Sequence, residues 1–160
     1  MKTWLAIAGV VLATGCHGGD KAADKADDNA ADKGRGDDKR NSMKLEANLT
    51  LDRMAKQSRR MFGDSGGFAV GQAGPTPATP CCQGANHKCA ISKEWASSPV
   101  WSALEFHVDE PGRFQYSYAG EAQKFTATAV GDVDCDGHPT TYTVHGMVDG
   151  NGMPQIDRLL

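Results

Sequence analysis

The sequence predicts an α+β domain, in which an N-terminal amphipathic helix packs on a three- to four-stranded antiparallel meander. We expect this domain to be cross-linked internally by disulfides and to be preceded by a disordered tether. Apolar residues recur at steps of three and four between positions 43 and 62, which is the period of a helix. Beyond Trp95 they alternate with polar residues, which is the period of a strand. Cysteines suited to disulfides lie between and within these two regions.

The N-terminus has the three parts of an export signal. Lys2 gives a positive start, residues 4–13 (WLAIAGVVLA) are apolar, and small residues follow. This apolar stretch is shorter than the roughly twenty residues that a helix needs to span a bilayer. We therefore expect residues 1–15 to be a signal peptide that is removed.

Residues 12–16, Leu-Ala-Thr-Gly-Cys, resemble the lipobox of bacterial lipoproteins, with the usual leucine one position early. The resemblance implies that Cys16 is lipidated, that the chain is cut before it, and that the lipid bilayer is a partner. It also implies the outer membrane of the cell envelope, because His17 rather than aspartate follows the cysteine. The alternative is ordinary signal-peptidase cleavage after Gly15, which would release a soluble secreted protein.

Residues 16–42 are expected to be a lipidated, disordered tether. From position 17 to 42 the segment contains no aromatic and no large aliphatic residue, and seven aspartates face six lysines and arginines. Such a segment buries too little apolar area to offset the entropy that ordering would cost.

The expected helix covers residues 43–62 and ends at Gly63. Its apolar stripe consists of Ala47, Leu51, Met54, Ala55, Ser58, Met61 and Phe62. A loop rich in glycine, proline and threonine follows, and its residues 75–80 (PTPATP) are too stiff and too poor in donors for regular structure.

Four segments alternate in the manner of strands: residues 104–108, 114–118, 125–129 and, more weakly, 142–144. Turn-like residues at 109–112 and 119–121 separate the first three. Short strands joined by tight turns predict an antiparallel meander with one face free to receive the helix.

Cys81, Cys82, Cys89 and Cys135 predict two disulfides, because paired cysteines are usual in exported chains. We expect one disulfide to join Cys135 to the vicinal pair. Cys82–Cys89 with Cys81–Cys135 is slightly preferred over the pairing that exchanges the two neighbours. A zinc site using His87 is the alternative, but adjacent cysteines are poor partners for one tetrahedral ion.

Residues 132–137 (DVDCDG) match the first half of a calcium loop, in which Asp132, Asp134 and Asp136 supply carboxylates and the glycine permits a sharp turn. His138 is expected to add its backbone carbonyl. The twelfth position is Thr143 instead of glutamate, which excludes a full EF-hand. The expected cofactor is therefore weakly bound Ca²⁺, and the alternative is a solvated turn.

Residues 63–67 (GDSGG) match the surroundings of the serine nucleophile in trypsin-like proteases. A serine needs a histidine base and an orienting acid, and His17 is the only histidine that precedes Ser65. We therefore expect no enzymatic activity and no catalytic residue, with an uncharacterised hydrolase as the remote alternative. A net charge of −3 gives no basic surface for nucleic acid.

The order of these features resembles the globular head of deltaproteobacterial type IV pilin-like proteins, over residues 43–160. The resemblance lies in the helix, the cysteine loop, Trp95 and Trp101, the Tyr-Ser-Tyr strand at 116–118 and the GDVDCDG turn at 131–137. It implies a long N-terminal helix on an antiparallel sheet, with a C-terminal region closed by a disulfide. The apolar N-terminal helix that filament pilins retain has no counterpart in the mature chain.

These features together predict a membrane-anchored, pilin-like lipoprotein that acts as a non-catalytic binding or accessory module on the surface or in the periplasm. A type IV pilus or a secretion system would supply its partner. The alternative is a structural lipoprotein of the cell envelope that is unrelated to filaments.

Overall fold

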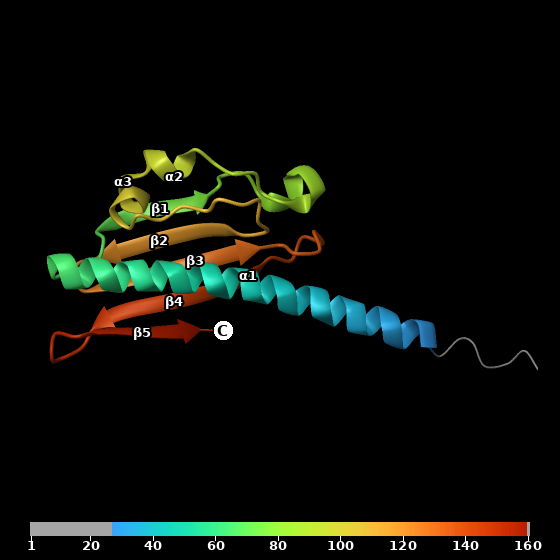
Figure 1. Ribbon diagram of the computed structural model, residues 1–160, viewed down its shortest axis with the longest axis horizontal. Coiled ribbons are helices and arrows are strands. Elements are labelled where there is room, and N and C mark those ends of the chain that lie inside the picture. Colours follow the sequence, from blue (N-terminus) through green and yellow to red (C-terminus); the bar gives the residue numbers. More distant parts are fainter. Residues whose placement is uncertain (1–26, 160) are drawn as a thin grey trace, which may run out of the picture.

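The computed structural model describes residues 27–159 and consists of a long helix, a five-stranded antiparallel sheet and short helices (Figure 1). The elements are α1 (Asp27–Ser65), β1 (Gly71–Thr76), η1 (Cys81–Gln83), η2 (Ala85–His87), α2 (Glu94–Ser97), α3 (Pro99–Ala103), β2 (Gln115–Glu121), β3 (Lys124–Gly131), β4 (Thr140–Val148) and β5 (Pro154–Leu159). The strands lie side by side in sequence order. The α+β class is therefore confirmed, with five strands instead of three or four.

The C-terminal part of α1 contributes one face to the hydrophobic core. The core residues of this face are Met43, Ala47, Leu51, Met54 and Ala55. Their spacing places them on one side of the helix, and this part of α1 crosses β3 and β4 in Figure 1. Within residues 27–159, no helix is both long enough and apolar enough to cross a membrane.

The helix ends two residues later than expected, at Ser65 rather than Gly63. The Ser65 hydroxyl donates to the carbonyl of Met61 at 2.8 Å, and the N–H of Gly66 donates to the carbonyl of Phe62 at 2.8 Å. Gly66 has a φ of 75°, a left-handed conformation that glycine adopts without a steric penalty. Gly66 is therefore the glycine that stops the helix.

The helix also begins earlier than expected. Residues 27–42 are helical, so the prediction of a disordered tether is wrong for them. Starting a helix is costly, whereas extending an existing one adds a hydrogen bond for each residue that is fixed. The packed part of α1 provides the start, and residues 27–42 contain no proline that would stop the extension. The expected signal peptide, Cys16 and the rest of the tether lie outside the described residues.

The sheet has one face covered by α1 and one open face. Tyr118, Ala127 and Val144 lie in register across β2, β3 and β4 and are buried in the same core as α1. Side chains alternate between faces along a strand, so Thr128 and its partner Thr143 lie on the opposite face, where they are half-buried. This pattern is typical of an antiparallel sheet with one solvated side.

The alternating residues 104–108 do not form a strand, which corrects the sequence prediction. Leu104 and Phe106 are both buried against the core, but they follow α3 in an irregular turn in which Glu105 has a φ of 48°. The N–H of Phe106 donates to the carbonyl of Trp101 at 2.9 Å. The alternation of apolar and polar residues here arises because Leu104 and Phe106 are buried on either side of a turn, and not because the segment is a strand.

Two other local predictions were also wrong. The strands β1 and β5 were not expected, and the Gly/Pro-rich loop was expected to lack regular structure, yet β1 lies within it. The turn expected at 119–121 is instead formed by residues 122–123, because β2 runs to Glu121.

Candidate functional site

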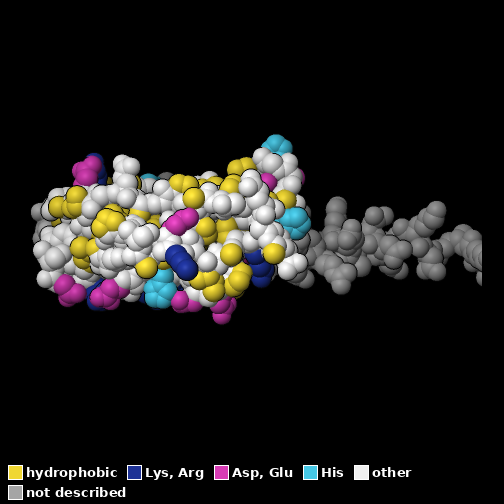
Figure 2. All heavy atoms as spheres, turned by 90° about the horizontal axis from the view of Figure 1, so that it is seen from above, with side chains coloured by type: hydrophobic (Ala, Val, Ile, Leu, Met, Phe, Trp, Pro, Cys, Tyr) yellow, Lys and Arg dark blue, Asp and Glu magenta, His cyan; other side chains and the backbone are white. Residues whose placement is uncertain are grey.

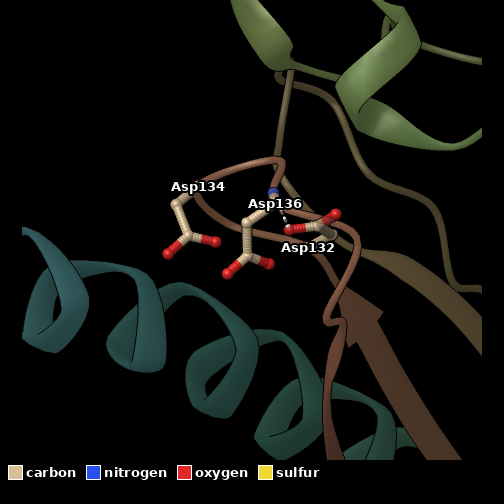
Figure 3. A group of neighbouring side chains, drawn as sticks. All are labelled: Asp132, Asp134 and Asp136. Atoms are coloured by element: carbon tan, nitrogen blue, oxygen red, sulfur yellow. Dashed lines mark hydrogen bonds between the residues drawn. The ribbon is translucent and has the colours of Figure 1, made fainter.

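The loop that joins β3 to β4 gathers three carboxylates. Asp132 is half-buried, whereas Asp134 and Asp136 are exposed. One oxygen from each of the three lies within 4.8 Å of the others. Figure 3 shows the carboxyl groups of Asp134 and Asp136 side by side, on the side of the loop that faces α1. The spacing noted in the sequence therefore brings these three side chains together.

The loop is shaped by hydrogen bonds between its own residues. The Asp132 carboxylate accepts the N–H groups of Asp136 at 3.2 Å and Gly137 at 2.8 Å. Asp136 accepts the N–H of His138 at 2.8 Å. The glycine has a φ of 91°, which supports the expected sharp turn. Asp132 thus organises the loop. The carboxyl groups of Asp134 and Asp136 point away from the loop (Figure 3), and Asp136 keeps one oxygen, Oδ2, that accepts no hydrogen bond from the loop.

The loop is shorter than a calcium loop of the EF-hand type. The strand β4 begins at Thr140, so Thr143, the twelfth position, pairs with Thr128 inside the sheet. Among the side chains that the structure describes, those of residues 41–158, the three aspartates are the ones close enough to share a cation, and the side chain of His138 does not join them. A cation here would take its remaining ligands from water and backbone carbonyls.

Two disulfides are present, Cys81–Cys89 and Cys82–Cys135. One of them joins Cys135 to the vicinal pair, as expected, but the slightly preferred pairing is wrong and the exchanged one is found. Cys81 is turned inward and is 6% exposed, as is Cys89, whereas Cys82 and Cys135 are half-buried. All four thiols are used in these bonds, so the alternative of a zinc site is contradicted.

The cysteine loop and the aspartate loop lie at the same end of the domain. Figure 1 places both at the end of the sheet toward which the N-terminal part of α1 projects. The Cys82–Cys135 disulfide joins them across a sequence separation of 53 residues. The acidic cluster and the Cys82–Cys135 disulfide therefore lie at the end of the domain beyond which the N-terminal part of α1 extends.

Ser65, the residue that a protease interpretation would make the nucleophile, lies at the exposed end of α1. Its hydroxyl contacts two backbone carbonyls, those of Met61 at 2.8 Å and Gly67 at 3.0 Å. This arrangement is a helix-terminating turn. It satisfies the hydroxyl locally instead of presenting it to a base.

Two shallow grooves flank the segment 107–109. The first, of about 370 Å³, lies over the aromatic rings of Trp95, Trp101 and Phe106, with Ile91 on its rim. Ile91 is 60% exposed. Figure 2 views the domain from the side of α2 and α3, where hydrophobic side chains reach the surface in separate groups among polar ones. The buried rings give this groove a rigid apolar floor.

The second groove, of about 540 Å³, lies between α1 and residues 108–112. Its lining has mixed charge, because it includes Glu46 and Arg53 of α1, Lys88, and the acidic residues Asp109 and Glu110. Tyr116 lies at its base, and burial raises the pKa of this phenol well above its ordinary range. The tyrosine therefore stays neutral and forms part of the floor of the groove.

The open face of the sheet carries a hydroxyl–imidazole contact that sequence reasoning missed. Thr126 Oγ1 lies 2.9 Å from Nδ1 of His145, which faces it in register on β4. Asp157 of β5 is the next residue in this row. The two residues are nineteen positions apart, so only the strand register could have revealed the pair.

Comparisons with known proteins gave no match to a family model, to a curated protein or to a solved structure. The pilin resemblance therefore remains an inference from the residues of this chain.

Proposed function

We propose that this chain is a lipid-anchored envelope protein whose domain, residues 43–160, is a pilin-like, non-catalytic binding or accessory module. In this proposal Cys16 carries the lipid and holds the chain on the outer membrane. The domain serves a type IV pilus or a secretion system by binding one of its components.

The observation that carries the proposal is the projection of α1 beyond the sheet (Figure 1). Residues 27–42, called the stem below, form a helical segment about 24 Å long, at about 1.5 Å per residue. The chain that leads back to Cys16 continues from the far end of the stem. The order of anchor, helix and domain suits a module held at a distance from a membrane surface.

The packing of α1 supports the pilin-like part of the proposal. Its second half shares a core with the antiparallel sheet, which is the arrangement that the resemblance implies. The stem differs from the apolar helix of filament pilins, because it contains aspartate, lysine and arginine and no large aliphatic residue. Such a stem suits solvent better than the apolar interior of a filament, which favours an accessory role over a filament subunit.

The disulfides support the export of the chain. Lasting disulfides form in oxidising compartments such as the periplasm and the cell surface. Both pairs involve residues of the domain, so folding of the domain is suited to the compartment that the signal peptide would reach.

We also propose that the aspartate loop binds Ca²⁺ weakly. Three carboxylates within 4.8 Å repel one another, and a divalent cation relieves this repulsion. The exposed position and the missing fourth acid favour a dissociation constant on the order of 10⁻⁴ M or higher, as in extracellular modules.

The anchor is tested with Cys16→Ser in cells fed radiolabelled palmitate. We expect the label to be lost and the protein to move from the membrane to the soluble fraction. His17→Asp is the matched control, which should keep the label and, by the sorting rule of lipoproteins, stay in the inner membrane. Undiminished labelling of Cys16→Ser would refute the lipid anchor.

The accessory role is tested by placing a photo-crosslinking residue at Ile91, on the rim of the aromatic groove. Gly150, an open position in the turn between β4 and β5, serves as the control. We expect Ile91 to capture a pilus or secretion component that the control position does not. Capture of no such component from either position, with normal filaments and secretion in a deletion strain, would favour the structural alternative.

A further inference from the structure

The two disulfides differ in their access to solvent. Cys81 and Cys89 are each 6% exposed, and their bond closes a separation of eight residues. Cys82 and Cys135 are half-buried, and their bond joins two distant loops. Thiol–disulfide exchange requires a thiolate to reach a sulfur atom, so access decides which bond is attacked first.

The Cys82–Cys135 bond is the covalent link between the aspartate loop and the cysteine loop. The hydrogen bonds that involve the side chains of Asp132 and Asp136 all stay within the loop. They preserve its local turn. A polar contact between the two loops is made by the disulfide itself, because Cys82 Sγ lies 2.8 Å from the carbonyl oxygen of Asp132. Val133 is the residue of this loop that packs partly against the core.

The core itself does not depend on this link. The cluster of buried core residues includes neither Cys82 nor Cys135. The register of β3 and β4 continues up to Gly131 and Thr140, the residues that flank the loop. Opening the bond would therefore free the loop while the sheet and the packed part of α1 remain.

We propose that Cys82–Cys135 is a redox-sensitive clasp, which a dithiol reductant opens reversibly while Cys81–Cys89 stays oxidised. One thiolate of the reductant attacks one sulfur of the clasp, and the other cysteine leaves as a thiolate and takes up a proton. The second thiol of the reductant then resolves the mixed disulfide and releases the remaining cysteine. The reductant ends as a disulfide, and two electrons and two protons have passed to the protein.

The clasp controls the end of the domain from which the stem projects. Closed, it fixes the loop on which Asp134 and Asp136 stand, with their carboxyl groups on the side that faces α1 in the view of Figure 3. Open, it lets the loop swing on its flanking strands. The surface presented beside the stem thus changes with the redox state, whether or not the loop binds a cation.

The test begins with the oxidised mature protein, treated with graded dithiothreitol in the absence of denaturant. Free thiols are trapped with iodoacetamide at intervals and located by peptide mass mapping. We expect Cys82 and Cys135 to be alkylated at least about ten times faster than Cys81 and Cys89, because access limits the exchange. Equal rates, or earlier reduction of the buried pair, would overturn the proposal.

The consequence is measured with the protease Asp-N, which cuts before aspartate. Reduction of the clasp should expose residues 132–136 to cleavage while near-ultraviolet circular dichroism stays native. Re-oxidation should restore both the resistance and the Cys82–Cys135 pairing. Unchanged resistance on reduction, loss of the native spectrum, or re-oxidation to another pairing would each contradict a reversible clasp.

Two double variants separate the clasp from the other disulfide. Cys82→Ala with Cys135→Ala should be cut with or without reductant. Cys81→Ala with Cys89→Ala should keep the response to reductant, because it retains the clasp. If the second pair folds poorly, the wild-type time course decides, since it requires no substitution.

Discussion

A methyl group placed on Gly146 should destabilise the domain, because β4 passes directly against an aromatic ring at this point. A Cβ built on Gly146 would overlap with the ring of Phe125. The ring is 2% exposed and is held between Phe68, at 4.9 Å between ring centroids, and Tyr118, at 5.4 Å. It cannot move aside without disturbing both neighbours, since protein interiors are close-packed.

Overpacking of this kind costs roughly 1–3 kcal/mol. For a domain of this size, each kcal/mol lowers the melting temperature by about 3–5 °C, so Gly146→Ala should melt about 3–15 °C below the wild type. Thermal and urea unfolding followed by circular dichroism would measure the loss. Gly150→Ala is the matched control, because a Cβ at Gly150 meets nothing within 4 Å and should leave stability nearly unchanged.

The ring is the stated cause, and a double-mutant cycle tests it. Phe125→Leu removes the outer edge of the ring, so adding Gly146→Ala in that background should cost less than in the wild type. An equal cost in both backgrounds would refute the steric explanation. A wild-type melting temperature for Gly146→Ala would refute the packing itself.

Three further predictions concern the aspartate loop, the buried tyrosines and one buried hydrogen bond. Millimolar Ca²⁺ should raise the melting temperature by a few degrees, because a tenfold excess over the dissociation constant stabilises the folded state by about 1.4 kcal/mol. Asp134→Ala should abolish this rise. Mg²⁺ should raise the melting temperature less than Ca²⁺ does, because it demands tighter coordination geometry. Burial raises the pKa of Tyr116 and Tyr118, to about 12 for Tyr118, so the unfolded chain, with an ordinary value of about 10, releases these protons first. The free energy of unfolding should therefore fall as pH rises from 10 towards 12, and flat urea midpoints across this window would contradict the burial. Thr76→Val removes the acceptor of the Trp101 Nε1–H bond at 3.0 Å and should cost about 1–3 kcal/mol in urea unfolding, whereas Thr76→Ser should cost much less.

The sequence predicted the central strands because their apolar residues obey a period of two. Tyr116, Tyr118 and Ala127 alternate with polar neighbours, and all three are buried beneath α1. The edge strands carry no such signal. β1 reads GQAGPT and is held by backbone pairing with β2. Among the side chains described for β5 (residues 154–158), Ile156 is the one that packs partly against the core. A strand defined mainly by its neighbour's backbone leaves little trace in its own side chains.

Composition misled the prediction for the stem for a related reason. A low content of apolar residues argues against a helix that is stabilised by its own packing at residues 27–42, but it does not exclude a helix that continues from a packed one. The nucleus lies further along the chain, in the turns around Met43 and Ala47, which are buried. Whether the stem is helical therefore depends on residues outside it, so the composition of the stem alone cannot predict its helix.

The aspartate loop separates what local spacing can predict from what it cannot. Asp132, Asp134 and Asp136 converge because all three lie within one turn of six residues, and the sequence contains that whole turn. The distant ligand of a calcium loop depends on where the next strand begins. Here Thr140 already pairs with Gly131, so Thr143 lies within the sheet and cannot join the cluster.

The disulfide pairing could not be predicted for the same reason. Cys81 and Cys82 are adjacent in the sequence, and the surrounding fold decides that Cys81 faces Cys89 and that Cys82 faces Cys135. Strand register and loop direction, which are tertiary properties, therefore decide how many carboxylates converge and which cysteines pair.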